Sequence, residues 1–321
     1  MRIGFVSASY APEPTGIGPY SAELAEALAG KGHAVRVIAA FPYHPGWHAR
    51  IPSGTLVYRT EEQQGVRVTR CRVYVPRNPR ALRRLAHDLS WMLAATPVLA
   101  RVARWADVWC VVTPLFGSAV LGASLARAFR ARVHLHVQDV VPDVAIESGL
   151  LGQGLIGRLA WSVASWTYRS YPSVSVLSAA MGATLQRYRG GAAGCEVVAP
   201  NWVRQDSGVR APLPERLRGC RYALYAGSFG RKQDLALVAE AAEILSRRGG
   251  PAVVVLGDGP GREVLERTGQ RVVWLGVVDE ATYRTVLDHA LAGIVALGAR
   301  MGDSVVPSKL AAYLGAGGAS D

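Results

Sequence analysis

The stretch YALYAGSFGRKQDLALVAEAAEIL, residues 222–245, decides the fold class of this chain. Residues 222–226 form an apolar run typical of a buried strand, a loop at 227–230 begins and ends with glycine, and residues 234–247 have the spacing of an amphipathic helix. The same order of strand, loop and helix recurs on both sides of this stretch. Such alternation predicts an α/β protein with mainly parallel sheets and helices on both faces.

Two series of elements are expected, separated by a polar, proline-containing connector at residues 205–218. In the first series the expected strands are 2–8, 34–39, 66–73, 107–112, 133–137 and 173–177, and the expected helices are 18–29, 81–95, 117–129, 155–171 and 180–189. In the second series the expected strands are 222–226, 253–256, 272–275 and 293–297, and the expected helices are 234–247, 261–266 and 280–287. We therefore expect two Rossmann-like, doubly wound domains, residues 1–200 and 201–321, whose ligands bind at the carboxyl ends of the strands.

Composition excludes a disordered chain and a disulfide scaffold. The 321 residues are 50% hydrophobic and 19% charged, which is ample for a buried core. The cysteines lie far apart, with no C-x-x-C pair and no clustered Cys/His ligands, so we expect a reduced protein without a metal site. The start of the chain lacks a signal-peptide pattern, and the apolar stretch 89–100 is too short to span a bilayer. We therefore expect a cytoplasmic protein.

Positive charge is concentrated in the first part of the chain. The formal net charge is +12, and most of the surplus lies before residue 200. The expected helix at 81–95 has Leu82, Leu85, Leu89, Met92 and Leu93 on its predicted core side, and Arg80, Arg83, Arg84, His87 and Trp91 on its predicted outer side. The outer side is either an ordinary solvated face or a surface attracted to the anionic inner leaflet of a membrane. Nucleic acid is not expected as a partner, because no DNA- or RNA-binding motif is present.

The loop after the first expected strand carries Gly16 and Gly18 directly before a helix. Glycines there let backbone N–H groups approach an anion or a sugar at the helix N-terminus, although a tight turn needs glycine equally well. A nicotinamide-dinucleotide fold would place an acidic residue at the end of the second strand, where this chain has Ala39 and Ala40. This difference argues against a dehydrogenase.

The expected strand at 133–137 carries polar side chains on one face. Alternation places His134, His136 and Gln138 together, and Asp139 follows at the exit of the strand. Polar groups on an interior strand must be satisfied, so these side chains either form hydrogen bonds among themselves or line a cleft. The acid at the strand exit favours a cleft.

Three loops of the second series have the character of a phosphate site. The first contains Gly227, Ser228, Gly230, Arg231 and Lys232, but its spacing is not that of a Walker loop. The second is the glycine-rich LGDGPGREVLE stretch, which contains Gly257, and the third begins a helix with Ser308 and Lys309. Glycines, a helix terminus and adjacent cations together indicate a nucleotide with phosphates.

With these motifs in place, the chain resembles the retaining GT-B glycosyltransferases of the glycogen synthase and sucrose synthase group, and within it the bacterial exopolysaccharide, colanic-acid-type branch. The stretches that carry the resemblance are PEPTGIGPYSAELAEAL, FPYHPGW, HVQDVVPD, APNWV, YAGSFGRKQDL, VVLGDGPGREVLE, VVWLGVVDEATYRTVL and VVPSKLAAYL, in this order over nearly the whole chain. The resemblance implies two domains that face a cleft, with a nucleotide-diphosphate-sugar donor in the second and a lipid-linked or saccharide acceptor in the first. It also implies retention at the anomeric carbon and no metal or cofactor.

By this likeness, His136, Gln138 and Asp139 are the candidate catalytic residues. The donor-binding residues that the motifs and the likeness together indicate are Gly16, Gly18, Gly227, Ser228, Gly230, Arg231, Lys232, Gly257, Val277, Ser308 and Lys309. Lys232 would contact the diphosphate, and Val277 would lie near the base.

The chain departs from the family pattern at several positions. Gln138 stands where the family often has histidine, and Ser228 stands where an arginine is common, which leaves Arg231 as a substitute. Ser304 and Ala312 occupy the positions of the E-x7-E acids, so Lys309 becomes the favoured donor contact. Family members continue further, so the second domain is expected to be truncated. A catalytically incompetent nucleotide-sugar-binding protein and a nucleotide-sugar epimerase therefore stay open as alternatives.

Overall fold

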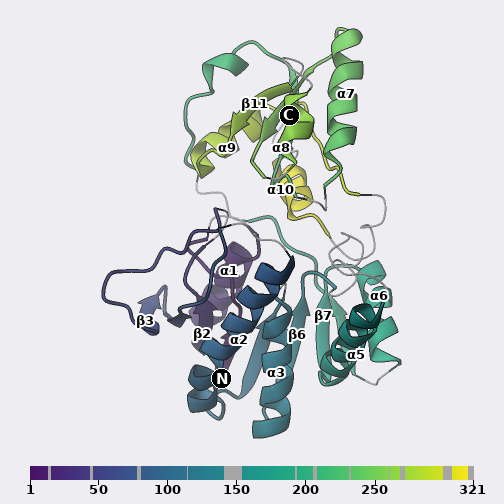
Figure 1. The fold of residues 1–321 in the computed structure, drawn as a ribbon. Coiled ribbons are helices and arrows are strands. Elements are labelled where there is room, and N and C mark those ends of the chain that lie inside the picture. Colours follow the sequence, from purple (N-terminus) through teal and green to yellow (C-terminus); the bar gives the residue numbers. More distant parts are fainter. Residues whose placement is uncertain are drawn as a thin grey trace. The chain divides into compact units, whose positions relative to one another are not determined.

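The computed structural model describes residues 1–13, 16–43, 46–77, 81–113, 115–140, 154–191, 194–204, 208–230, 233–259, 261–267, 272–298 and 306–316. The chain folds into two compact units, the first covering Met1–Pro200 and the second beginning at Asn201. Each unit is an α/β structure with its own sheet (Figure 1).

The first unit is built on a sheet of eight described strands. They are β1 (Arg2–Val6), β2 (Ala34–Ala40), β3 (Tyr58–Gln63), β4 (Val66–Cys71), β5 (Val108–Val112), β6 (Val133–Val137), β7 (Ser173–Val176) and β8 (Cys195–Val198). Their order is β3-β4-β2-β1-β5-β6-β7-β8, and all pairs are parallel except β3 with β4. Parallel pairing brings the carboxyl ends of β1, β2, β4, β5, β6 and β7 to one edge of the sheet.

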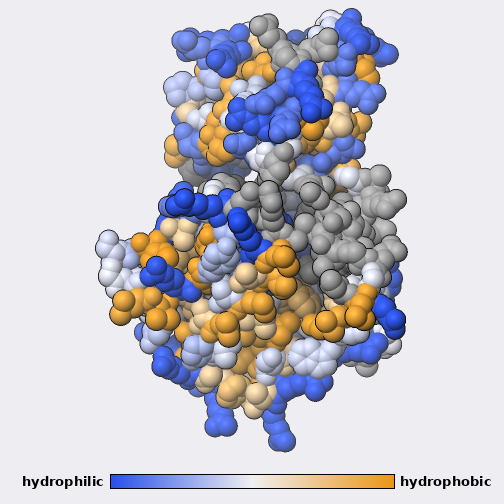
Figure 2. Space-filling model, viewed as in Figure 1, coloured by the Kyte–Doolittle hydropathy of each residue, from blue (hydrophilic) through white to orange (hydrophobic). Residues whose placement is uncertain are grey.

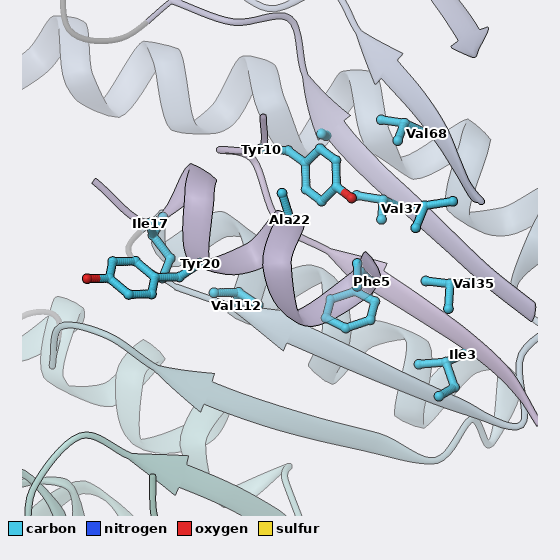
Figure 3. Packing of buried hydrophobic residues seen from close by; sticks show 13 residues of the cluster. Ile3, Phe5, Tyr10, Ile17, Tyr20, Ala22, Val35, Val37, Val68 and Val112 are labelled. Atoms are coloured by element: carbon cyan, nitrogen blue, oxygen red, sulfur yellow. The ribbon is translucent and has the colours of Figure 1, made fainter. Parts of the chain in front are cut away.

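Helices cover both faces of this sheet. They are α1 (Gly18–Gly30), α2 (Ala81–Val102), α3 (Phe116–Phe129), α5 (Leu155–Arg169) and α6 (Ala179–Arg189). On one face α1 packs with Phe5 and Val37 in an apolar core (Figure 3). The adjacent Gly4 turns to the other face, where a Cβ atom would lie 2.3 Å from the ring of Trp109. The helices α2, α3, α5 and α6 lie side by side on that second face (Figure 1).

Two strands of this unit were not expected from the sequence. The edge strand β3 is polar, YRTEEQ, and largely exposed, so it lacks the apolar signal of a buried strand. Its pairing is supported instead by charged partners on β4, as Arg67 Nε donates to Glu62 Oε1 at 2.8 Å. The other, β8, is a short run of four residues.

The orientation predicted for α2 was wrong. Leu82 and Leu93 are 81% and 77% exposed, whereas His87 and Trp91 are buried. Trp91 buries more apolar surface than a leucine can, and its Nε1 donates to Ser118 Oγ at 3.0 Å. The helix also continues through Pro97 to Val102, beyond the expected end at residue 95.

The second unit has a smaller parallel sheet. The strands β9 (Tyr222–Ala226), β10 (Ala252–Leu256), β11 (Val272–Gly276) and β12 (Ala292–Gly293) lie in the order β11-β10-β9-β12. The helices are α7 (Leu235–Arg247), α8 (Arg262–Glu266), α9 (Glu280–Asp288) and α10 (Ser308–Ala316), with a short 3-10 turn at Glu215–Leu217. The strand β12 is much shorter than the expected 293–297, and the ring of Tyr313 on α10 packs directly against Gly293.

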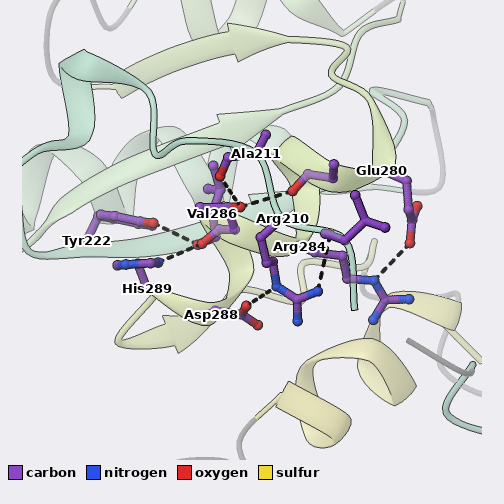
Figure 4. A network of polar contacts seen from close by, with 11 residues as sticks. Arg210, Ala211, Tyr222, Glu280, Arg284, Val286, Asp288 and His289 are labelled. Atoms are coloured by element: carbon purple, nitrogen blue, oxygen red, sulfur yellow. Dashed lines mark hydrogen bonds and ion pairs between the residues drawn. The ribbon is translucent and has the colours of Figure 1, made fainter. Parts of the chain in front are cut away.

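The connector that precedes β9 is anchored on α9 (Figure 4). Ala211 accepts a hydrogen bond from Thr285 Oγ1 at 2.7 Å, and Arg210 forms an ion pair with Asp288. Tyr222 on β9 donates to the carbonyl of Val286 at 2.7 Å. The residues 208–211 therefore belong structurally to the second unit.

Candidate functional site

In the second unit, two glycine turns at the carboxyl ends of β9 and β10 pack main chain against main chain. Gly227 has φ +149° and donates its N–H to the carbonyl of Leu256 at 2.9 Å. Gly257 has φ +129°, and a Cβ atom there would lie 1.9 Å from the carbonyl oxygen of Gly227. Only glycine fits this contact, because any side chain would overlap backbone that cannot move aside.

The loop between Gly227 and Gly230 is held in place by the second turn. Phe229 is buried, its N–H donates to the carbonyl of Asp258 at 3.0 Å, and its own carbonyl accepts from Gly261 at 2.9 Å. The predicted donor residue Ser228 thus lies in a fixed loop at the edge of the sheet.

Lys309 brings a cation to this edge from α10. Its Nζ donates to Gln233 Oε1 at 3.1 Å and lies 3.9 Å from the centre of the Tyr225 ring. The same nitrogen is 3.2 Å from the point where a Cβ atom on Gly227 would be. Burial lowers the pKa of Lys309 to about 8, so the ammonium group is still charged at neutral pH.

The structure therefore brings Gly227, Gly257 and Lys309 together, as the loops predicted. Val277 is 66% exposed just after β11, and Ser308 is exposed at the start of α10. The predicted Arg231 and Lys232 lie outside the described residues. The sequence analysis did not single out Gln233 and Tyr225, although both lie within the YAGSFGRKQDL stretch.

In the first unit, the loop after β1 is tied to the segment after β2. Gly16 adopts φ +71° in open space, and Gly18 begins α1. Glu13 is buried, and its Oε1 accepts the N–H of Tyr43 at 3.0 Å. This link joins two of the loops at the carboxyl edge of the sheet.

The predicted polar face of β6 is confirmed, and its side chains form hydrogen bonds within the protein, which is the alternative that the sequence analysis did not favour. His136 Nδ1 lies 2.8 Å from Ser175 Oγ, and its Nε2 lies 2.6 Å from Gln138 Nε2. His134 contacts Ser173 and Ser175 on β7, each at 2.8 Å. Burial lowers the pKa of His136 to about 4 and also lowers the pKa of His134, so both rings are neutral near pH 7.

The two hydroxyl groups on β7 were missed, although SVSV beside HLHV carries a signal for them. In a parallel pair, residues opposite each other point to the same face, and the register pairs His134 with Ser173 and His136 with Ser175. At the end of β6, the backbone N–H of Gln138 donates to Thr113 Oγ1 at 2.9 Å. Asp139 follows directly, partly exposed, at the carboxyl edge.

A cavity of about 550 Å³ opens beside the segments that follow β2 and β4. Trp47, His48, Arg72, Tyr74 and Arg77 are among its lining residues, and no acidic residue lines it in the described part of the chain. Aromatic rings and arginines are the side chains that bind sugars and phosphates.

Over the described ranges, no three His, Cys, Asp or Glu side chains are grouped closely enough to hold a metal ion. Within the same ranges, no helix combines the length and apolar character needed to cross a membrane.

Two α/β units, each with candidate ligand groups at the carboxyl edge of its parallel sheet, make up the architecture of GT-B glycosyltransferases. Residues 15–202 match the family model of the glycosyl transferase 4-like domain. The chain belongs to this family and is a glycosyltransferase.

Individual relatives agree with this assignment. The chain is 32% identical to WcaI, which is described as a colanic acid biosynthesis glycosyl transferase of Escherichia coli (strain K12). The alignment is 342 positions long and covers 99% of this chain and 82% of the relative. Its fold is similar to that of a trehalose-6-phosphate protein from E. coli bound with UDP-2-fluoro glucose, with a TM-score of 0.69 at 11% identity over 98% of this chain and 82% of that one. WaaG, a glycosyltransferase involved in lipopolysaccharide biosynthesis, gives a TM-score of 0.61 at 16% identity over 98% and 79%.

Proposed function

We propose that this glycosyltransferase moves a sugar from a nucleotide-diphosphate-sugar to a lipid-linked or saccharide acceptor in the synthesis of an exopolysaccharide or another cell-surface glycan. The observation that carries the proposal is the group formed by Gly227, Gly257 and Lys309, in which a cation faces a glycine turn. The similarity to WcaI supports the glycan class.

The donor binds to the second unit. The glycine turns allow the diphosphate to approach the main chain, and Lys309 neutralises part of its charge. The fold is shared with a protein whose structure holds UDP-2-fluoro glucose, which supports a nucleotide-sugar donor.

The acceptor binds to the first unit. The cavity beside Trp47 and Tyr74 offers aromatic faces to a sugar ring, and Arg72 and Arg77 favour an acceptor that carries negative charge. A lipid-linked saccharide carries phosphate and fits this chemistry.

The reaction replaces one bond at the anomeric carbon by another. The bond to the acceptor oxygen forms and the bond to the diphosphate oxygen breaks, and the proton of the acceptor hydroxyl passes to the departing nucleoside diphosphate. Lys309 stabilises the charge that develops on the leaving group, a role that a metal ion has in other enzymes. We accordingly propose transfer without a metal, and retention at the anomeric carbon as the family resemblance implies.

The test is a screen of nucleotide-sugars with the full chain in the presence of a chelator. We expect turnover with at least one donor, and loss of nucleoside diphosphate binding in Lys309→Met. Binding without turnover would favour a catalytically incompetent protein, and a new sugar nucleotide formed from the donor alone would identify an epimerase. Either result would contradict the proposed transfer.

We further propose that the first unit attaches peripherally to an anionic membrane at the cytoplasmic face. The helices α2, α3, α5 and α6 together contain eight arginines, of which Arg189 is buried, and only one acidic residue, Asp88. Leu82, Leu85, Leu89 and Leu93 form an exposed ridge on α2, and Figure 2 shows hydrophobic side chains gathered over this face. Arg83 and Arg84 are exposed on the same helix, whereas Arg80 lies outside the described residues. Leucines that enter the interface and arginines that meet anionic headgroups fit such a surface.

Vesicle sedimentation tests the attachment. We expect binding to vesicles with anionic lipid and little binding to neutral ones, since each arginine near the surface contributes about 1 kcal/mol. Leu85→Ser with Leu89→Ser, and separately Arg83→Glu with Arg84→Glu, should each weaken binding at least tenfold. Leu237→Ser is the matched control, because Leu237 is 53% exposed on α7 of the other unit. Equal binding by all variants would refute the attachment.

A further inference from the structure

The cavity of the first unit has two walls, which come from different segments of the chain. The first wall follows β2 and includes Trp47, and the second wall follows β4 and includes Arg72, Tyr74 and Arg77. Residues 47–51 and 72–77 belong to no helix or strand. The shape of the cavity therefore depends on the contacts that these segments make with the rest of the unit.

Trp47 in the first wall has a backbone conformation that bulky residues rarely adopt. Its φ is +50°, in the left-handed region. Such a conformation persists only where the surroundings hold it, and it is common at ligand sites. The indole packs against the rings of Tyr43 and His87, with ring centres 5.5 and 5.6 Å away, and the guanidinium carbon of Arg84 lies 5.5 Å from the indole centre. The packing of its side chain thus holds Trp47 at the cavity.

The second wall is attached to helix α2 through the backbone of Tyr74. Ser90 Oγ accepts a hydrogen bond from the Tyr74 N–H at 2.9 Å and donates to the carbonyl of His87 at 2.7 Å. The Tyr74 carbonyl oxygen lies 2.5 Å from Nδ1 of His87. Because a carbonyl oxygen can only accept, Nδ1 of His87 carries a proton and donates it to Tyr74. Both polar groups of the Tyr74 backbone are therefore bound by α2.

His87 is the side chain that the two walls share. It is 1% exposed, and it contacts Trp47 through its ring and Tyr74 through Nδ1. The same ring meets the Tyr43 ring in an edge arrangement, with ring centres 4.8 Å apart. A side chain packed so closely has little freedom to move. His87 therefore sets the position of the first wall relative to the second.

The two walls offer different chemistry to a ligand. Trp47 is partly exposed, and its indole combines a large apolar surface with one N–H donor, which suits the mixed apolar and hydroxyl surface of a sugar ring. Arg72 and Arg77 are exposed, and a guanidinium group pairs with carboxylate or phosphate through two parallel hydrogen bonds. A sugar that carries an anionic group matches both walls at once.

We propose that His87 is a positioning residue of the acceptor site, which holds Trp47 against a sugar ring while Arg72 and Arg77 meet an anionic group on the same acceptor. The inference rests on the proposed function, because it takes this cavity as the acceptor site. It adds the class of acceptor, an anionic sugar, and it gives a role to a buried residue of α2 that contacts no ligand itself.

Titration of the full chain with small sugars tests the class of ligand. The probes are glucose 1-phosphate and glucuronic acid, with glucose as the uncharged comparison. The readout is the NMR signal of the Trp47 indole N–H, assigned with Trp47→Phe. We expect at least one anionic probe to shift this signal and to bind at least tenfold more tightly than glucose, the effect of a hydrogen bond to a charged group. That probe then identifies the anionic group.

The arginines provide the control for this titration. Arg72→Gln with Arg77→Gln should remove the preference for the anionic probe, because glutamine keeps hydrogen-bond donors but carries no charge. Equal affinity of the wild type for glucose and both anionic probes, or an indole signal that no probe shifts, would overturn the proposal.

Two variants at position 87 each break one of the two links. His87→Phe keeps a ring against Trp47 and loses the donor to Tyr74, whereas His87→Asn keeps a donor close to the place of Nδ1 and loses the ring. Each should weaken the anionic probe about tenfold. The affinity for UDP, which we place in the second unit, should change less than twofold. Unchanged affinity for the anionic probe in both variants would refute the positioning role.

Ser90 provides a second pair that avoids changes at a fully buried position. Ser90→Ala removes the hydrogen-bond acceptor of the Tyr74 N–H, and Ser90→Thr retains it. The anionic probe should bind about fivefold more weakly to Ser90→Ala than to Ser90→Thr. Ser124→Ala on α3 is the matched control, because Ser124 Oγ donates to the carbonyl of Val120 on its own helix. Equal probe affinity in Ser90→Ala and Ser90→Thr would contradict the proposal even if the His87 variants fail to fold.

The outcomes for this inference and for the proposed function are distinct. Turnover of a nucleotide-sugar by a chain whose Trp47 signal responds to no probe would refute the inference alone. Binding of an anionic probe at Trp47 by a chain that turns over no nucleotide-sugar would refute the proposed function, and the cavity would still be a site for an anionic sugar.

Discussion

Raising the pH from 7 to 9 should weaken nucleoside diphosphate binding about tenfold. Burial lowers the pKa of Lys309 to about 8, so its charged fraction falls from about 0.9 at pH 7 to about 0.1 at pH 9. Its Nζ lies 3.2 Å from the position that a Cβ atom on Gly227 would occupy, and a diphosphate would approach the turn there. If only the ammonium form holds the phosphates, affinity follows the charged fraction. Titration calorimetry with UDP at pH 7, 8 and 9 measures this decline.

Two variants distinguish the pH dependence of binding that Lys309 causes from the pH dependence caused by protonation of the ligand itself. Lys309→Met should bind weakly at every pH, and Lys309→Arg should bind with little dependence on pH, because the guanidinium stays charged. The folding stability should change in the opposite direction to the affinity as the pH rises. The unfolded lysine, with its ordinary pKa of 10.5, binds more protons than the folded one between pH 8 and 10.5, so the stability of the wild type relative to Lys309→Met should rise over that range. A wild-type affinity that is constant from pH 7 to 9, or the same decline in Lys309→Met, would refute the role of Lys309.

Two further predictions concern stability. Gly257→Ala should cost at least about 3 kcal/mol, because it combines a disfavoured φ with a methyl group 1.9 Å from the carbonyl of Gly227. Gly249→Ala is the control, because Gly249 has φ +64° with open space around it, and it should cost about 1 kcal/mol. Equal losses in the free energy of unfolding, measured in urea, would contradict a clash at Gly257. Burial raises the pKa of Asp88 to about 6, so the native state binds more protons than the unfolded state between pH 4 and 6 and stability falls as pH rises through this range. Asp88→Asn keeps an acceptor for the Gly117 N–H, so this variant should be at least as stable as the wild type at pH 7. It should also lose the dependence of stability on pH between about 4 and 6. If thermal unfolding still shows that dependence in the variant, Asp88 is not its source.

Most elements of both units could be predicted from the sequence because their apolar patterns are local. The strands 133–137 and 222–226 agree with the structure at both ends. The edge strand β3 could not be found, since its residues are charged and its pairing with β4 depends on contacts across the hairpin. The faces of α2 were misassigned because both sides of the helix contain apolar residues, and the contact between Trp91 and Ser118 on α3 decides which side is buried.

In the candidate site, too, some features follow from local sequence patterns and others depend on tertiary contacts. Gly227 and Gly257 are separated in the chain, yet each directly follows a strand of one parallel sheet, so their convergence follows from topology alone. The contacts of Lys309 with Gln233 and Tyr225 depend on how α10 packs against β9, which no local pattern encodes. The hydrogen bonds between β6 and β7 are intermediate between these cases. Their residue types are visible in HLHV and SVSV, but only the register of the two strands makes them partners, and a shift of one residue would place the serines on the opposite face.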